Sequence, residues 1–164
     1  MHPNHLVNSG NQKIKEMLSN TSKYAVRALI YMGIFAEKGG KIGIKKITSD
    51  LDIPSPFLGK ILQSLVKNKI LTSTKGPNGG FSLRKDPEEI TLYDIIAIID
   101  GEEFFTNCLV DLNACLDFRA KGGKACTIHN CFCDVRREIR DFYKQTTLAT
   151  VAAEFIEKKE LLKM

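Results

Sequence analysis

The spacing of apolar residues predicts four helices in the first hundred positions of the chain. We expect them at 22–37, 44–51, 56–68 and 91–99. The third helix follows the breaker run DIPSP, in which Ser55 is a good N-cap and Pro56 suits the first helical position. Its expected buried stripe consists of Phe57, Leu58, Ile61, Leu62, Leu65 and Val66.

A β-hairpin is expected between the third and fourth helices. The segment ILTST is rich in β-branched residues, and the glycine-rich turn KGPNGG separates it from a second strand, FSLRK. Helix, helix, turn, helix and hairpin follow one another in the order of a winged helix-turn-helix. The predicted fold class is therefore mainly α with a small β-hairpin wing: a winged helix-turn-helix plus a long C-terminal dimerisation helix.

The C-terminal helix is expected from Asp134 to Lys159. Its mostly apolar stripe steps alternately by four and three residues. The stripe comprises Val135, Ile139, Phe142, Thr146, Ala149, Ala153 and Ile156. An isolated helix of this kind would be poorly buried, so we predict that it pairs with a second copy in a homodimer.

These elements divide the chain into four parts. We expect a disordered extension at 1–16, a winged helix-turn-helix DNA-binding domain at 17–100, a cysteine-rich sensor loop at 101–133 and a dimerisation helix at 134–164. The polar start lacks the apolar run and cleavage site of a secretory signal. No stretch approaches the roughly 18–20 uninterrupted apolar residues that a membrane span needs. We therefore expect a cytoplasmic protein.

Charge is unevenly distributed along the chain. Residues 22–85 carry twelve Lys or Arg against three Asp or Glu, whereas residues 86–164 carry ten against fifteen. A basic N-terminal half suits the phosphate backbone of double-stranded DNA, although an ordinary solvated lysine-rich surface would give the same balance.

The third helix and the hairpin supply the candidate DNA contacts. A short polar helix face suits the major groove, a helix N-terminus offers free N–H groups to a phosphate, and glycines let a backbone approach a sugar-phosphate chain closely. Lys75, at the base of the turn, is placed to enter the minor groove or to pair with a phosphate. The full candidate set is Ser55, Pro56, Gly59, Lys60, Gln63, Ser64, Lys75, Gly76, Asn78, Gly79 and Gly80.

Five cysteines lie within 26 residues near the middle of the second half. They are Cys108, Cys115, Cys126, Cys131 and Cys133. This clustering favours a metal or redox site over a disulfide scaffold, which would spread its cysteines through the fold. Three thiolates and the imidazole of His129, which two residues separate from Cys126, suit an iron–sulfur cluster or tetrahedral zinc.

The segments SKYAVRAL, IPSPFLGKILQSLVKNKILTSTKGPNGGFSL and ITLYDIIAIIDG resemble the Rrf2 family of bacterial transcription regulators. This resemblance implies a winged helix-turn-helix that dimerises through its C-terminal helix. The segment ACTIH resembles the third-cysteine and histidine segment of IscR-type members, which implies that Cys108, Cys115, Cys126 and His129 hold a 2Fe–2S cluster. Cys131 and Cys133 fall outside the family pattern, and three roles are open to them: alternative ligands, a redox pair with Cys126, or inert residues near a helix start.

Three positions depart from relatives within this family. The wing usually carries arginine where this chain has Lys75, and lysine lacks the planar guanidinium fork. IscR-type members carry glutamate where this chain has Gly59, so their operator preference does not carry over. NsrR-type members take a ligand from an aspartate at the position of Lys23, which disfavours a 4Fe–4S centre of that type and favours His129.

The predicted function is regulation of transcription by DNA binding, with iron–sulfur or redox status sensed through a metal centre in the cysteine loop. The alternative is a regulator of the same fold that holds zinc or no metal and acts by thiol chemistry or through a partner protein. An enzyme is not expected, because no nucleophile is paired with a base and no dinucleotide or phosphate-binding loop is present.

Overall fold

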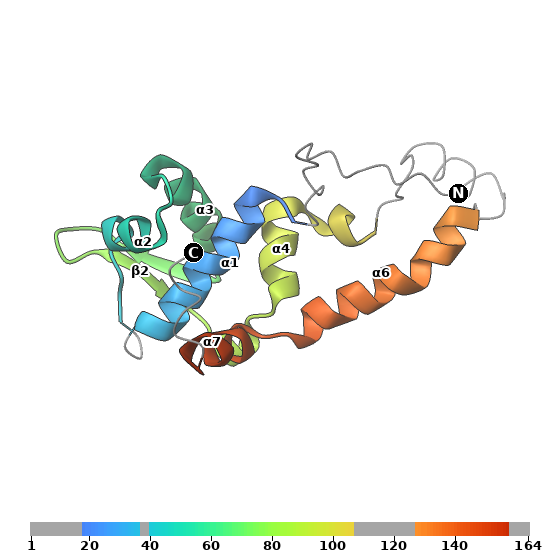
Figure 1. Ribbon diagram of the computed structural model, residues 1–164. Helices are drawn as coiled ribbons and strands as arrows, with labels where there is room; N and C mark the ends of the chain where they lie inside the picture. Colours follow the sequence, from blue (N-terminus) through green and yellow to red (C-terminus); the bar gives the residue numbers. More distant parts are fainter. Residues whose placement is uncertain (1–17, 37–39, 107–126, 158–164) are drawn as a thin grey trace, which may run out of the picture.

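The computed structural model describes residues 18–36, 40–106 and 127–157 (Figure 1). The predicted 1–16 extension lies outside the described residues, and so do Cys108, Cys115 and Cys126. The elements are α1 (Asn20–Phe35), α2 (Ile44–Leu51), α3 (Ser55–Lys67), β1 (Leu71–Thr74), β2 (Gly80–Leu83), η1 (Pro87–Glu89), α4 (Leu92–Asp100), η2 (Glu102–Phe105), α6 (Thr127–Gln145) and α7 (Leu148–Glu157).

The predicted mainly helical fold with one hairpin is confirmed, and local signals explain most element boundaries. Helix α1 begins earlier than expected because the Ser19 side chain caps it by accepting the Ser22 N–H at 3.0 Å. Thr91 caps α4 in a capping box with Asp94. The predicted N-cap of α3 is wrong by one residue: Pro54 is the cap, and its carbonyl accepts from the N–H groups of Phe57 and Leu58.

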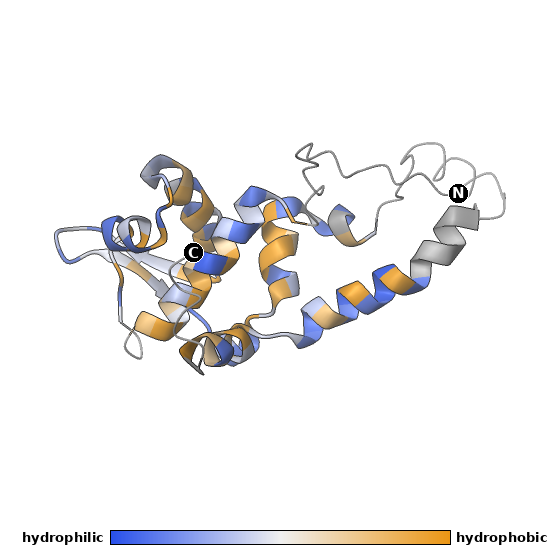
Figure 2. Ribbon diagram, in the orientation of Figure 1, coloured by the Kyte–Doolittle hydropathy of each residue, from blue (hydrophilic) through white to orange (hydrophobic). Residues whose placement is uncertain are grey.

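The main core lies between α1, α3, α4 and α7. Its largest side chains with no exposed surface include Leu29, Leu58, Leu62, Leu65, Ile95 and Leu148. Figure 2 shows that the apolar faces of α1, α4 and α7 are turned toward one another, as burial of their apolar area requires. The core thus holds one face of α3, and the opposite face of this helix is exposed to solvent.

The hairpin is anchored to the helices by a short third segment that the sequence analysis did not predict. Strands β1 and β2 are antiparallel, with Leu71 opposite Leu83. Ile42, just before α2, exchanges two backbone hydrogen bonds with Phe81, at 2.9 and 3.0 Å. The hairpin therefore forms a continuous surface with the segment leading into α2.

The predicted single helix at 134–159 is wrong, because the structure has two helices there. Helix α6 begins at Thr127, inside the predicted loop, and ends before Thr146. The backbone around Thr146 and Thr147 instead pairs with the segment before α4: the Leu92 N–H donates to the Thr146 carbonyl and the Leu148 N–H to the Ile90 carbonyl. Helix α7 then packs along α1, whereas α6 projects away from the main core (Figure 1).

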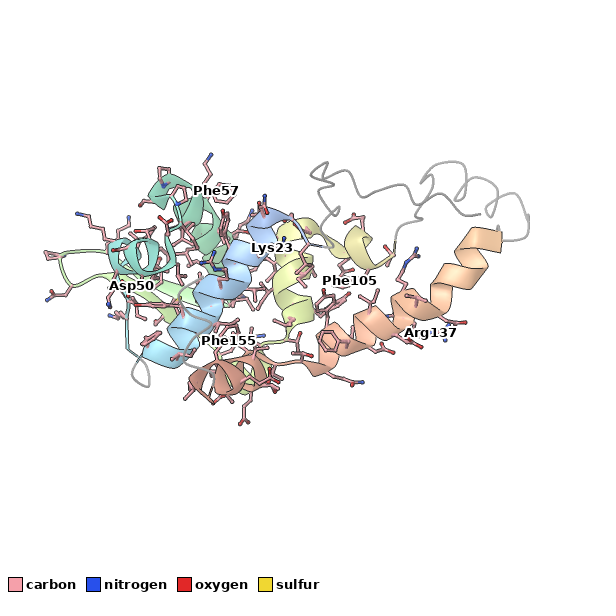
Figure 3. All side chains as sticks on the ribbon, viewed as in Figure 1. Lys23, Asp50, Phe57, Phe105, Arg137 and Phe155 are labelled. Atoms are coloured by element: carbon pink, nitrogen blue, oxygen red, sulfur yellow. The ribbon has the colours of Figure 1, made fainter. Side chains whose placement is uncertain are left out.

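A second apolar cluster joins α6 to α4. Its buried members are Ile96, Phe105 and Tyr143, and the Phe105 ring lies 4.5 Å from the Tyr93 ring and 5.8 Å from the Tyr143 ring (Figure 3). Burial raises the pKa of the Tyr143 hydroxyl.

None of the helices in the described ranges has the length and apolar content that a membrane span requires.

Candidate nucleic-acid interface

Helix α3 presents a polar face to solvent. Ser55, Pro56, Lys60 and Gln63 are exposed, and Gly59 and Ser64 are half-buried. The opposite face is fixed in the core by Leu58, Ile61, Leu62 and Leu65. All six residues predicted on this helix therefore lie on or beside its solvent-facing surface.

Phe57 departs from the predicted buried stripe. It is 38% exposed, and its ring meets the edge of Tyr24 on α1 at a centroid distance of 5.6 Å. Helical spacing groups it with Leu58 and Ile61, but it lies in the first turn, where Tyr24 covers it only in part.

Two polar contacts from α1, made by Tyr31 and Arg27, hold the orientation of α2 relative to α1. The Tyr31 hydroxyl donates a hydrogen bond to Asp50, and the Lys46 ammonium donates to the same carboxylate at 3.0 Å. The bond from Tyr31, followed by that from Lys46, lowers the pKa of Asp50. The Arg27 guanidinium donates to the Leu51 carbonyl at 2.9 Å and so secures the end of α2.

The tip of the hairpin is a tight, exposed turn. Lys75, Gly76 and Asn78 are exposed, and Gly76 has a φ of +110°, which side-chain-bearing residues rarely adopt. The Gly79 N–H closes the turn by donating to the Gly76 carbonyl at 2.9 Å. A Cβ on Gly80 would lie 2.6 Å from the Ile42 carbonyl oxygen, so this position requires glycine.

Exposed lysines lie on α3, at the wing and on α2 with the segment before it. Besides Lys60 and Lys75, which the sequence analysis selected, Lys41, Lys45 and Lys46 are exposed on α2 and the segment before it. These three lysines contribute to the basic charge of residues 22–85 but were not among the predicted contacts. The Lys45-Lys46 pair on a helix-turn-helix first helix was the signal that could have identified them, since that helix crosses the DNA backbone in this class.

The predicted metal ligands are only partly within the described residues. His129 belongs to the first turn of α6, which begins one residue after Cys126, and Cys131 and Cys133 lie on the same helix. The positive end of a helix dipole favours thiolates and other negative charge, so the start of α6 is compatible with an anionic centre near Cys126. Among the described residues, no group of three or more His, Cys, Asp or Glu could hold a metal ion.

A polar recognition helix held by a helical core, beside a glycine-tipped wing, defines a DNA-binding protein of the winged helix-turn-helix class. The model of the Rrf2 family, described as an iron-dependent transcriptional regulator, matches residues 18–154. The chain therefore belongs to the Rrf2 family of transcription regulators and is not an enzyme.

Known proteins of this family resemble the chain over most of its length. A candidate HTH-type transcriptional regulator of Aquifex aeolicus is 33% identical over 145 residues, which cover 88% of this chain and 96% of that protein. The regulator IscR of Pectobacterium atrosepticum is 28% identical, with 88% and 82% covered.

Solved structures share the fold. CymR, the global cysteine regulator of B. subtilis, has a TM-score of 0.69 at 19% identity, with 84% of this chain and 96% of CymR covered. IscR of T. potens has a TM-score of 0.60 at 21% identity, with 94% and 95% covered.

Proposed function

We propose that this protein is a homodimeric regulator that binds a palindromic operator through α3 and the wing, under the control of a metal centre in the cysteine segment. The observation that carries the DNA-binding part is the joint exposure of the α3 polar face and the wing tip, with Lys60 and Lys75 both in solvent. The family match to transcription regulators supports the same function.

Different contacts follow from the two surfaces. The uncharged polar side chains Ser55, Gln63 and Ser64 are of the type that reads base edges in the major groove, and Lys60 reaches either a guanine or a phosphate. The closely packed glycines of the wing let the backbone approach the sugar-phosphate chain. Lys75 then reaches a phosphate or the minor groove beside it.

The dimer is proposed from the free face of α6. Val135 is 45% exposed and Phe142 is 60% exposed, and the two residues lie seven positions apart, so they share one side of the helix. Ile139 lies in the same stripe, and it packs with the neighbouring Tyr143 on the second apolar cluster, so Val135 and Phe142 form the exposed edge of that stripe. An exposed apolar strip on a projecting helix is stabilised when a second copy covers it.

The metal centre is proposed from its donor set. Cys108, Cys115, Cys126 and His129 provide three thiolates and an imidazole, which fit a 2Fe–2S cluster by ligand type. When bound, such a cluster would supply redox or cluster-occupancy chemistry as the signal. The chain's own contribution is that α6, which carries His129, contacts α4 and continues toward α7 on the main core, so the ligand segment is joined mechanically to the DNA-binding unit.

DNA binding is tested by fluorescence anisotropy on duplexes selected from a random pool, at several salt concentrations. Affinity is expected to fall steeply with salt. Lys60→Ala or Lys75→Ala is expected to weaken binding and reduce the salt slope by about 1 for each phosphate left without its lysine. Lys144→Ala, which removes a lysine on α6 that lies over the Tyr93 ring, is the matched control and should leave DNA affinity unchanged. Salt-independent affinity would contradict the phosphate-contact scheme.

The metal centre is tested by anaerobic purification, a visible absorption spectrum and analysis of iron and sulfide. Iron and sulfide in stoichiometric amounts are expected, and Cys115→Ala should abolish them while Cys131→Ala and Cys133→Ala retain them. Full metal content in Cys115→Ala would refute the ligand set. A colourless protein that contains zinc or no metal would instead support the alternative regulator, which acts by thiol chemistry or through a partner protein.

A further inference from the structure

The exposed aromatic ring of Phe57 stands at the start of the helix proposed to read DNA. Five large apolar side chains are exposed among the described residues: Phe35, Phe57, Val135, Phe142 and Ile156. Phe57 alone of these five belongs to α3, and it lies one turn before Lys60. An exposed phenylalanine ring does not contribute the favourable free energy of apolar burial. A ligand that covers the ring would gain that free energy on binding.

The ring is braced from α1 rather than free on the surface. Tyr24 meets it nearly at right angles, with an interplanar angle of 84°. Arg27 lies over the other ring of this pair, 6.0 Å from the Tyr24 centroid, and also holds the Leu51 carbonyl. Figure 3 shows Phe57 at the outer end of α3, away from the main core. A ring held in this way loses little conformational freedom on binding.

The N-terminal residues of a recognition helix approach base edges most closely. In the major groove, the one apolar group on any base edge is the C5 methyl of thymine. We propose that Phe57 packs on a thymine methyl in each half-site and thereby selects thymine at one operator position. This inference rests on the proposed DNA-binding function and adds a specificity determinant to its polar contacts.

The test compares thymine with deoxyuridine, which pairs identically and lacks only the methyl group. Duplexes selected by the wild-type protein are synthesised with one thymine at a time replaced by deoxyuridine. At one position in each half-site, replacing thymine with deoxyuridine is expected to weaken wild-type binding about fourfold. This factor corresponds to the burial of one methylene-sized group. The Phe57→Ala variant should bind both duplexes equally, which assigns the methyl contact to this side chain by a thermodynamic cycle.

Two further comparisons keep the test decisive. Phe35→Ala removes an exposed phenylalanine at the end of α1 and should retain the thymine preference in full. If Phe57→Ala unfolds because Tyr24 loses its neighbour, Phe57→Leu and Phe57→Gln decide instead. Leucine keeps an apolar surface and should retain part of the preference, whereas glutamine, of similar length but polar, should lose it.

The possible results distinguish failure of the Phe57 contact from failure of the proposed DNA binding. Tight, salt-sensitive binding with no thymine position sensitive to deoxyuridine would overturn the role of Phe57 and leave DNA binding intact. The same sensitivity in Phe57→Ala as in the wild type would also overturn it. Failure to select any duplex would overturn the proposed DNA-binding function, and the inference with it.

Discussion

Replacing Gly80 with alanine is expected to detach the wing from the segment before α2. The added Cβ would lie 2.6 Å from the Ile42 carbonyl oxygen and 2.8 Å from its carbonyl carbon. Both obstacles are backbone atoms, so no side-chain rotation can relieve them. The strand segment at Ile42 or the strand at Phe81 must therefore move, and the two hydrogen bonds between these residues are the interactions at risk.

The size of the effect follows from those two bonds. Each backbone hydrogen bond contributes a net ~0.5–1.5 kcal/mol, so losing both lowers the free energy of unfolding by about 1–3 kcal/mol. A chain of this length loses roughly 2–4 °C in Tm for each kcal/mol. Phe81, only 8% exposed, would also become more exposed as the strands separate.

Circular dichroism during thermal unfolding measures the stability, and anisotropy on a selected duplex measures the wing's function. Gly33→Ala is the matched control, because its Cβ would meet Leu148 at an ordinary 3.8 Å in the interior of α1. That variant should be more stable than the wild type by about 0.5–1 kcal/mol. An unchanged Tm in Gly80→Ala, with unchanged DNA affinity, would refute the reasoning.

Three other changes probe separate parts of the molecule. Asp50→Asn should flatten the acid limb of stability: hydrogen bonds hold the folded-state pKa of Asp50 below its unfolded value, so the wild type loses stability as pH falls toward that folded-state pKa. Parallel wild-type and variant urea midpoints across that range would contradict this. Phe142→Lys should convert a dimer to a monomer in sedimentation experiments, and an unchanged mass would exclude this face of α6. Leu62→Ala, at a fully buried site, should cost about 2–5 kcal/mol in chemical denaturation, and a cost below ~1 kcal/mol would argue against its place in the core.

Local signals predicted most of the fold. The bounds of the second helix matched the observed α2, and Thr91 was placed at the start of α4, where its side chain forms the cap. The hairpin was predicted from its glycine-rich turn, because a tight turn is specified by a few consecutive residues. The exposed polar residues of α3 followed from helical spacing alone.

Features that depend on pairing between residues far apart in the chain were not predicted from the sequence. Ile42 pairs with Phe81 some forty positions away, and no local pattern announces such a bridge. The break between α6 and α7 has the same origin, because the backbone groups on either side of Thr147 form hydrogen bonds with the segment around Thr91. One local signal was overlooked there: the Thr147 hydroxyl accepts from the Thr150 N–H, as an N-cap does.

Because α7 packs on α1, both ends of the described chain contribute to the same core. Leu148 belongs to the same core as the buried residues of α1 and α3, although it follows the cysteine segment in sequence. That segment is therefore an insertion within a closed folding unit, not a tail appended to one. A hybrid regulator built by grafting a foreign sensing segment would need to keep both flanks, up to Thr106 and from α6 onward. Cutting the chain after residue 106 would leave Leu29 and its neighbours without their cover.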